Sequence, residues 1–213
     1  ARAERLSWLT GFTGSAGVAL VGKDKAAVYS DSRYTEQMKT QLDPALFEAV
    51  QQTMKNSPDD WLIAHMPGGG KVGYDPRLHT VQEIERHCKK LAARGIEAVA
   101  VDGNLIDAIW NDQPDHPDDK VVVYPEIYAG RSADDKRSTI AAEIGDAGAK
   151  TTLLTEPDSI AWLLNIRGSD VPHVPVPLSY ALLHDNGTVD WFIPPQKVTA
   201  DVKRHIGNHV QIH

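Results

Sequence analysis

Cysteine is nearly absent from this sequence, and its scarcity excludes a fold held by disulfides. The one cysteine, Cys88, has no partner within the chain and falls on the apolar face of an expected helix. We therefore expect it in the core rather than as a nucleophile. A chain without disulfides suits a reducing compartment, which predicts a cytoplasmic protein.

Long apolar runs and basic runs are missing too. No stretch approaches the roughly 20 apolar residues that a membrane-spanning helix requires. The 22 basic and 29 acidic side chains leave a net charge of −7. We expect neither nucleic acid nor a membrane as a partner, because both present negative charge.

Glycines occur in clusters, but these clusters lack the order that binds nucleotides. Residues 68–71 read GGGK and are followed by valine, where a phosphate-binding loop has serine or threonine. Gly11, Gly14 and Gly17 do not keep the dinucleotide-binding spacing, nor do they follow a strand and open a helix. A helix end and a tight turn explain both clusters.

Metal and nucleophile motifs are also lacking. Of the nine histidines, His205 and His209 have helical spacing, but Gly207 between them should end the helix. The aspartates of residues 112–119 lack the glycine and closing glutamate of a calcium loop. No serine has the setting of a nucleophile elbow. A catalytic triad stays open, because its members need not be close along the chain.

What the sequence does contain is an internal repeat. Residues 7–17 read SWLTGFTGSAG and residues 161–171 read AWLLNIRGSDV, so that Trp8 aligns with Trp162. Each copy is followed by two short apolar runs around a turn, which predicts a β-hairpin. In the second copy the hairpin is delayed by residues 171–178, which we expect to loop out. The repeat favours two related domains in which the two tryptophans are buried equivalently.

Periodicity and capping residues predict the other elements. Ser57-Pro58 and the box from Thr80 to Glu83 mark helix starts, as does Ser132. Expected strands cover 18–21, 26–29, 46–51, 71–74, 97–101, 121–124, 151–154, 180–183, 189–193 and 209–212. Expected helices begin at or near residues 33, 58, 81, 104, 132 and 197. Among the expected strands, the run 18–21 is apolar without alternation, which predicts a strand covered on both faces.

Helices that alternate with strands predict an α/β fold with two mixed-sheet domains. Prolines and aspartates concentrate between residues 111 and 131, which indicates a linker. We place the domain boundary near residue 130, with the first domain in 1–130 and the related second domain in 131–213. Compared with each other, the copies suggest that the first domain lacks its beginning and that the second is incomplete.

Two polar stretches invite a functional interpretation. Residues 31–34 read DSRY and stand where a strand ends and a helix begins, a usual place for functional groups in α/β sheets. A helix cap followed by a solvated arginine explains the same letters. Alternate prolines stiffen residues 171–177, which form either the wall of a cleft or the cover of a sheet edge.

Taken together, these motifs resemble a known family. The segments that carry the likeness, in order, are RLSWLTGFTGSAG, SDSRYTEQ, KVGYDP, NLIDAIWNDQP and PDSIAWLLNIRGSDVPHVPV. They resemble the three-domain Xaa-Pro aminopeptidases (aminopeptidase P) of the creatinase/prolidase "pita-bread" metallopeptidases. The family motif has glycine where Ser32 stands, so the turn here should be less strained.

The resemblance implies a function as well as a fold. The first two domains of that family are related creatinase-N-terminal-type domains, and a third domain holds two manganese ions through two aspartates, a histidine and two glutamates. The sequence matches only the non-catalytic front, so we expect no catalytic or metal-binding residue here. The whole enzyme would be a cytoplasmic homodimer that removes the residue before a penultimate proline of peptides.

The resemblance also suggests which residues lie near substrate. In creatinase-like enzymes, part of the first domain lies near the active site of the partner subunit. The positions that match are Phe12 and Ser15 in the glycine-rich loop, and Arg33 and Tyr34 at the strand end. The alternative is a free-standing binding or dimerisation module that shares these domains and has no peptidase activity.

Overall fold

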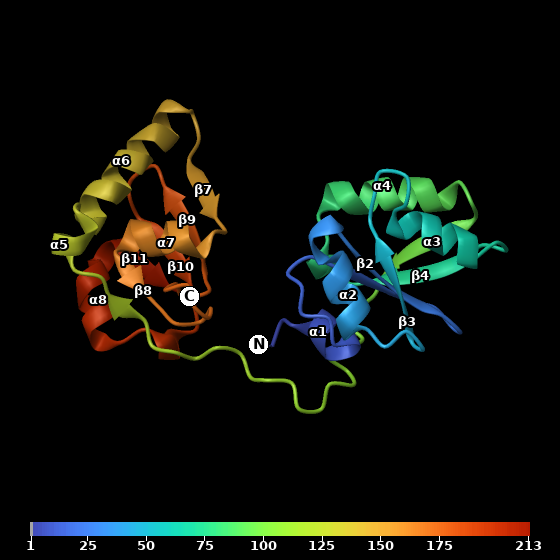
Figure 1. The fold of residues 1–213 in the computed structure, drawn as a ribbon. Helices are drawn as coiled ribbons and strands as arrows, with labels where there is room; N and C mark the ends of the chain where they lie inside the picture. Colours follow the sequence, from blue (N-terminus) through green and yellow to red (C-terminus); the bar gives the residue numbers. More distant parts are fainter. Residues whose placement is uncertain (1) are drawn as a thin grey trace. The chain divides into compact units, whose positions relative to one another are not determined.

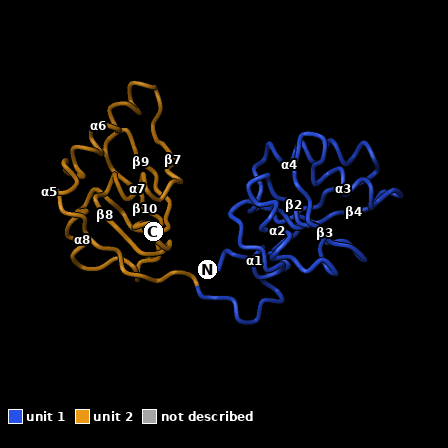
Figure 2. Tube along the Cα trace, in the orientation of Figure 1, with its two compact units in different colours: residues 1–115 blue, residues 116–213 orange. Residues whose placement is uncertain are grey.

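Two compact units make up the chain, and each is described by itself (Figures 1 and 2). The structure is a computed structural model and describes residues 2–213. Unit 1 ends at Asp115 and unit 2 begins at His116. The boundary therefore lies earlier than the position near residue 130 that the sequence suggested. The physical reason is Val121, which is fully buried within the core of unit 2.

Unit 1 contains a three-stranded mixed sheet with helices on both faces, followed by a parallel pair of strands. Strand order in the sheet is β1-β2-β3, with β1 and β2 antiparallel and β2 and β3 parallel; β4 pairs with β5. The elements are α1 (Arg5–Thr10), β1 (Val18–Val21), β2 (Ala26–Ser30), η1 (Ser32–Tyr34), α2 (Thr35–Gln41), β3 (Phe47–Gln51), α3 (Pro58–His65), β4 (Gly70–Tyr74), η2 (Pro76–Leu78), α4 (Val81–Ala92) and β5 (Ile96–Ala100).

Unit 2 is built around a four-stranded mixed sheet. Its order is β11-β10-β9-β7, and a separate short pair joins β6 to β8. The elements are β6 (Val122–Val123), α5 (Glu126–Ala129), α6 (Ala133–Asp146), β7 (Thr151–Leu154), α7 (Pro157–Leu164), β8 (Ile166–Arg167), β9 (Tyr180–His184), β10 (Val189–Phe192), η3 (Pro195–Lys197), α8 (Ala200–Ile206), η4 (Gly207–His209) and β11 (Val210–Ile212).

Strand β2 forms the centre of unit 1. Side chains alternate across a strand, so Val28 packs with Met38 of α2 on one face, while Tyr29 packs with Trp61 of α3 on the other. The sequence predicted this double cover for β1, and that prediction was wrong. Val21 is 67% exposed because β1 is an edge strand.

The repeat is confirmed as a shared topology. In unit 1 an antiparallel hairpin, β1-β2, is followed by α2 and a parallel third strand, β3; in unit 2 the same order is β9-β10, α8, β11. The extra residues of the second copy fold back onto its Gly-Ser turn. The amide of Asp170 donates to the carbonyl of Val176 over 3.3 Å, and Val176 is buried. This segment therefore covers its own turn.

The expected burial of the two repeated tryptophans was wrong. Trp8 is 38% exposed and Trp162 is 45% exposed. Each has one face covered: the Trp8 ring stacks on Trp110 at a centroid distance of 5.3 Å, and the Lys136 ammonium lies 4.6 Å from the Trp162 ring. The two tryptophans are therefore equivalent in their burial, but both are half-buried.

Residues 104–110 form turns instead of the expected helix. The Asn104 side chain accepts the amide of Ile106 at 3.0 Å, which offers the backbone an alternative to helical bonding. Arg5 of α1 binds Asp107 with two hydrogen bonds of 2.7 Å and fixes the turn against α1. Among residues 2–213, no helix has both the length and the apolar character to cross a membrane.

Candidate functional site

The four residues singled out in the sequence meet around Tyr34. The Ser15 hydroxyl lies 2.6 Å from the Tyr34 phenol oxygen. The Phe12 ring meets the Tyr34 ring edge-on, with centroids 5.8 Å apart at 89°. The Arg33 guanidinium carbon lies 5.2 Å from the Tyr34 ring centroid, within cation–π range. Residues far apart in sequence thus form one cluster at the end of β2.

Local chain geometry brings the glycine-rich loop to this place. Helix α1 ends at Thr10 and is followed by Gly11, whose φ of 77° is a left-handed conformation that favours glycine. The Thr10 hydroxyl then accepts the amide of Phe12 at 3.1 Å and turns the chain inward. A side chain at Gly14 would collide with the Phe12 ring, so glycine lets the loop close over that ring.

Arg33 is paired and remains accessible. The Asp31 carboxylate accepts the Arg33 amide at 3.0 Å and the guanidinium at 3.0 and 2.7 Å. These side-chain and backbone bonds from Arg33 lower the pKa of Asp31. The Arg33 side chain is nevertheless 67% exposed. Both interpretations of the DSRY sequence are therefore physically compatible, because Asp31 caps the turn while the cation faces solvent.

A hollow of about 490 Å³ lies beside the cluster. It is lined by α1 and by the loop that follows, including Ser7, Phe12 and Ser15. Phe12 itself is only 1% exposed, so it supports the hollow from the core more than it forms a wall. The hydrogen bond from Ser15 lowers the pKa of Tyr34. The cluster offers a cation, two hydroxyls and loop backbone for binding.

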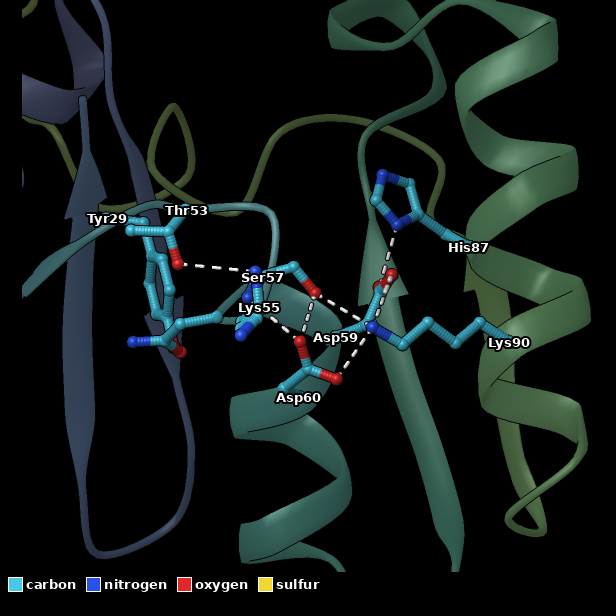
Figure 3. A network of polar contacts seen from close by, with 9 residues as sticks. Tyr29, Thr53, Lys55, Ser57, Asp59, Asp60, His87 and Lys90 are labelled. Carbon is cyan, nitrogen blue, oxygen red and sulfur yellow. Dashed lines mark hydrogen bonds and ion pairs between the residues drawn. The ribbon is translucent and has the colours of Figure 1, made fainter.

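A second polar network, which the sequence analysis did not foresee, joins α3 to α4 (Figure 3). His87 Nδ1 lies 2.7 Å from Oδ1 of the buried Asp59, and Lys90 Nζ lies 2.7 Å from Asp60 Oδ1. Lys90 also donates to Ser57 Oγ at 2.9 Å. The only sequence signal was the Ser-Pro-Asp-Asp helix start, which does not show that α4 packs beside it.

This network has the residue types of a nucleophilic site, but it does not offer Ser57 a free base. Hydrogen bonds from Lys90 and from Ser57 lower the pKa of Asp60 to about 2, so its carboxylate is ionised at neutral pH. Lys90 is held in an ion pair with that carboxylate and is not available as a base for Ser57. The Ser57 hydroxyl itself donates to Asp60 over 2.7 Å. The network is a clamp between two helices.

Comparison with known proteins assigns the family. A model of the creatinase/prolidase N-terminal domain matches residues 1–109, and a second model with the same description matches residues 112–213. The chain belongs to the creatinase/prolidase N-terminal domain family. Both halves of the repeat thus carry the same kind of domain, which confirms the resemblance and the α/β fold expected from the sequence.

Curated relatives of these creatinase-type domains are longer proteins. The chain is 35% identical over 209 residues to a probable Xaa-Pro aminopeptidase P of Pyrenophora tritici-repentis, covering 97% of this chain and 35% of that protein. It is 37% identical over 201 residues to one of Leptosphaeria maculans, covering 93% and 33%. The chain therefore spans about a third of the length of the curated relatives it matches.

A solved structure also contains both creatinase-type domains. The X-prolyl aminopeptidase of Caenorhabditis elegans matches all of this chain and 35% of its own, with a TM-score of 0.89 and 30% identity. That protein is described as a cytosolic enzyme with a di-nuclear active site. Within residues 2–213 of the present chain, no group of three or more His, Cys, Asp or Glu side chains is placed to hold a metal ion. These residues do not fit a dinuclear centre.

Proposed function

We propose that this chain is the N-terminal portion of an aminopeptidase that releases the residue preceding a penultimate proline. The supporting observation is the match to the Caenorhabditis elegans X-prolyl aminopeptidase over the full length of the chain. The whole enzyme acts on proline-containing peptides in the cytoplasm as a homodimer. Its two manganese ions are bound by residues outside this chain, and no catalytic step is assigned to residues 2–213.

Within that enzyme, the cluster around Tyr34 serves to shape substrate access at the dimer. A guanidinium can hold a peptide carboxylate or carbonyl through paired N–H donors. Arg33 has this capacity because Asp31 fixes its orientation while most of its side chain stays exposed. Ser15 and Tyr34 fix the glycine-rich loop beside it. The chain thus contributes binding and positioning rather than bond cleavage.

Replacing Arg33 by alanine in the full-length enzyme tests this role. We expect kcat/KM for an Xaa-Pro peptide to fall. The corresponding activation free energy should rise by roughly 1.5–3 kcal/mol, which is the loss of a charge-assisted hydrogen bond. Thermal stability and metal content should not change. Arg77→Ala is the matched control, since the Arg77 amide is accepted by Asp75 at 2.9 Å in the same kind of turn. Equal effects of the two substitutions would make Arg33 structural.

The coding sequence beyond His213 distinguishes the enzyme from a free-standing module. A following domain with two aspartates, a histidine and two glutamates in ligand arrangement supports the peptidase. A stop codon close behind residue 213 would contradict it and would favour a binding or dimerisation module.

A further inference from the structure

Arg131, Lys136 and Arg167 of unit 2 donate their side-chain hydrogen bonds to groups other than carboxylates. Arg131 donates to the carbonyl of Asp135 and to the Thr139 hydroxyl, and Arg167 donates to the carbonyls of Ile166 and Ala161. Lys136 donates to the Asn165 side chain at 2.6 Å and to the Trp162 carbonyl at 3.0 Å. All of these partners are neutral. None of the ion pairs formed by the described residues includes these three cations.

Lys136 shows how close together these charges lie. It is only 2% exposed, and burial lowers its pKa most, followed by the charges of Arg167 and Arg131. On α6, the Asp134 carboxylate is paired with Arg137. A cluster of like charges is unfavourable unless something of opposite charge is placed against it. In a chain with a net charge of −7, such a cluster is a local exception.

Aromatic rings share the surface with the two arginines. The Arg167 guanidinium carbon lies 3.8 Å from the Tyr124 ring centroid, and the Tyr124 and Tyr128 rings are 6.1 Å apart. Tyr128 is 71% exposed, and Trp162, whose ring is contacted by Lys136, is 45% exposed. We call Tyr124, Tyr128, Arg131, Trp162 and Arg167 the Arg-aromatic patch. Tyr128 lies in α5, Trp162 in α7 and Arg167 in β8, while Tyr124 follows β6 and Arg131 precedes α6.

The composition of this patch is that of a protein interface. Tyrosine, tryptophan and arginine are the side chains that contribute most to interface energy, because they bring apolar area together with fixed donors. Ile127 on α5 adds an apolar side chain that is 85% exposed. An exposed apolar surface with cations bonded to neutral groups fits a partner that supplies carboxylates and covers the rings.

We propose that the Arg-aromatic patch docks an acidic surface of the polypeptide that follows residue 213 in the intact protein. Charge complementarity gives the chemistry of that surface. Relative length gives its source, since the curated relatives have about two thirds of their length outside the region matched by this chain. The inference rests on the proposed function, because it requires that this chain continue into a further domain.

Hydroxyl-radical footprinting of the full-length protein tests the proposal, with oxidation of Tyr128 and Trp162 measured residue by residue. Both should react slowly in the parent protein. In the variant Arg131→Gln/Arg167→Gln both should react at least about tenfold faster, because losing charge-assisted contacts of this kind releases a docked surface. The control Lys23→Gln/Lys150→Gln removes the same charge from exposed lysines elsewhere and should leave both rates unchanged. Circular dichroism shows whether the variants fold.

Three results would overturn the proposal. Fast oxidation in the parent protein means that nothing covers the patch. Slow oxidation that persists in the arginine variant means that the covering surface is not acidic. Protection of Tyr128 and Trp162 that is lost on dilution means that a second molecule, and not the same polypeptide, covers the patch. Peptidase activity of the same preparation separates the two proposals: an active enzyme with fast oxidation retains the proposed function and loses this inference.

Discussion

The Ser15 hydroxyl and the Tyr34 phenol oxygen lie 2.6 Å apart and join the loop after α1 to η1, the short helix that follows β2. The two residues are 19 positions apart, so the contact adds a tertiary anchor to a glycine-rich loop that is also held by bonds from Thr13 to Gln41 and from Ser30 to Ala16. Arg33 is the neighbour of Tyr34 in sequence and lies against its ring. The position of the loop and the orientation of the cation are therefore coupled.

A double-mutant cycle measures this coupling. Ser15→Ala and Tyr34→Phe each remove the same hydrogen bond. In the full-length enzyme, each should therefore lower kcat/KM by an amount equivalent to about 0.5–1.5 kcal/mol of activation free energy. The double variant should lose no more than either single variant. Steady-state kinetics on an Xaa-Pro peptide give the three values. Fully additive losses would show that the two side chains act independently.

The tryptophans predict an order of stability losses. Trp191 is fully buried, so Trp191→Ala should cost about 3–5 kcal/mol in the free energy of unfolding. Trp8 and Trp162 keep 38% and 45% of their surface in water, so their alanine variants should cost about 1–3 kcal/mol. Urea unfolding of residues 1–213 provides the comparison. A loss for Trp162→Ala as large as that for Trp191→Ala would contradict the observed exposure.

The clamp between α3 and α4 predicts acid sensitivity. The pKa of Asp60 falls from 3.8 to about 2 on folding, so its contribution is present above about pH 4 and is lost as pH falls toward 2. Its side chain is 41% exposed, and solvent screening limits the contribution to about 0.5–1 kcal/mol. Urea midpoints of the parent and Asp60→Asn should converge at low pH. Glu36→Gln, which removes an exposed acid paired with Lys39, is the control.

Much of the fold was predictable because its signals are local. The box at Thr80 is formed as expected, with the Thr80 hydroxyl accepting the amide of Glu83, and α3 begins at Pro58 directly after Ser57, as those residues indicated. The repeated hairpins were visible as apolar runs around turns. What failed depended on tertiary context. Strand β1 has the sequence of a covered strand, but its place at the edge of the sheet exposes it.

The candidate site was predictable only in part. Sequence identified Phe12, Ser15, Arg33 and Tyr34 through a family resemblance, but it did not show that the first three each contact Tyr34. It showed the helix start at Ser57 but not the clamp from Asp60 to α4, nor the patch at Arg167, because those contacts join residues from separate elements. Local motifs cannot report which helices pack together.

The most direct measurement compares the full-length protein with residues 1–213 in an Xaa-Pro peptide assay with manganese. We predict that the full-length protein releases the N-terminal residue and that a chelator abolishes the reaction. Residues 1–213, which have no group of side chains placed to hold a metal ion among residues 2–213, should give no turnover. Chelator-sensitive turnover by residues 1–213, or a full-length protein that does not cleave such peptides, would contradict the account.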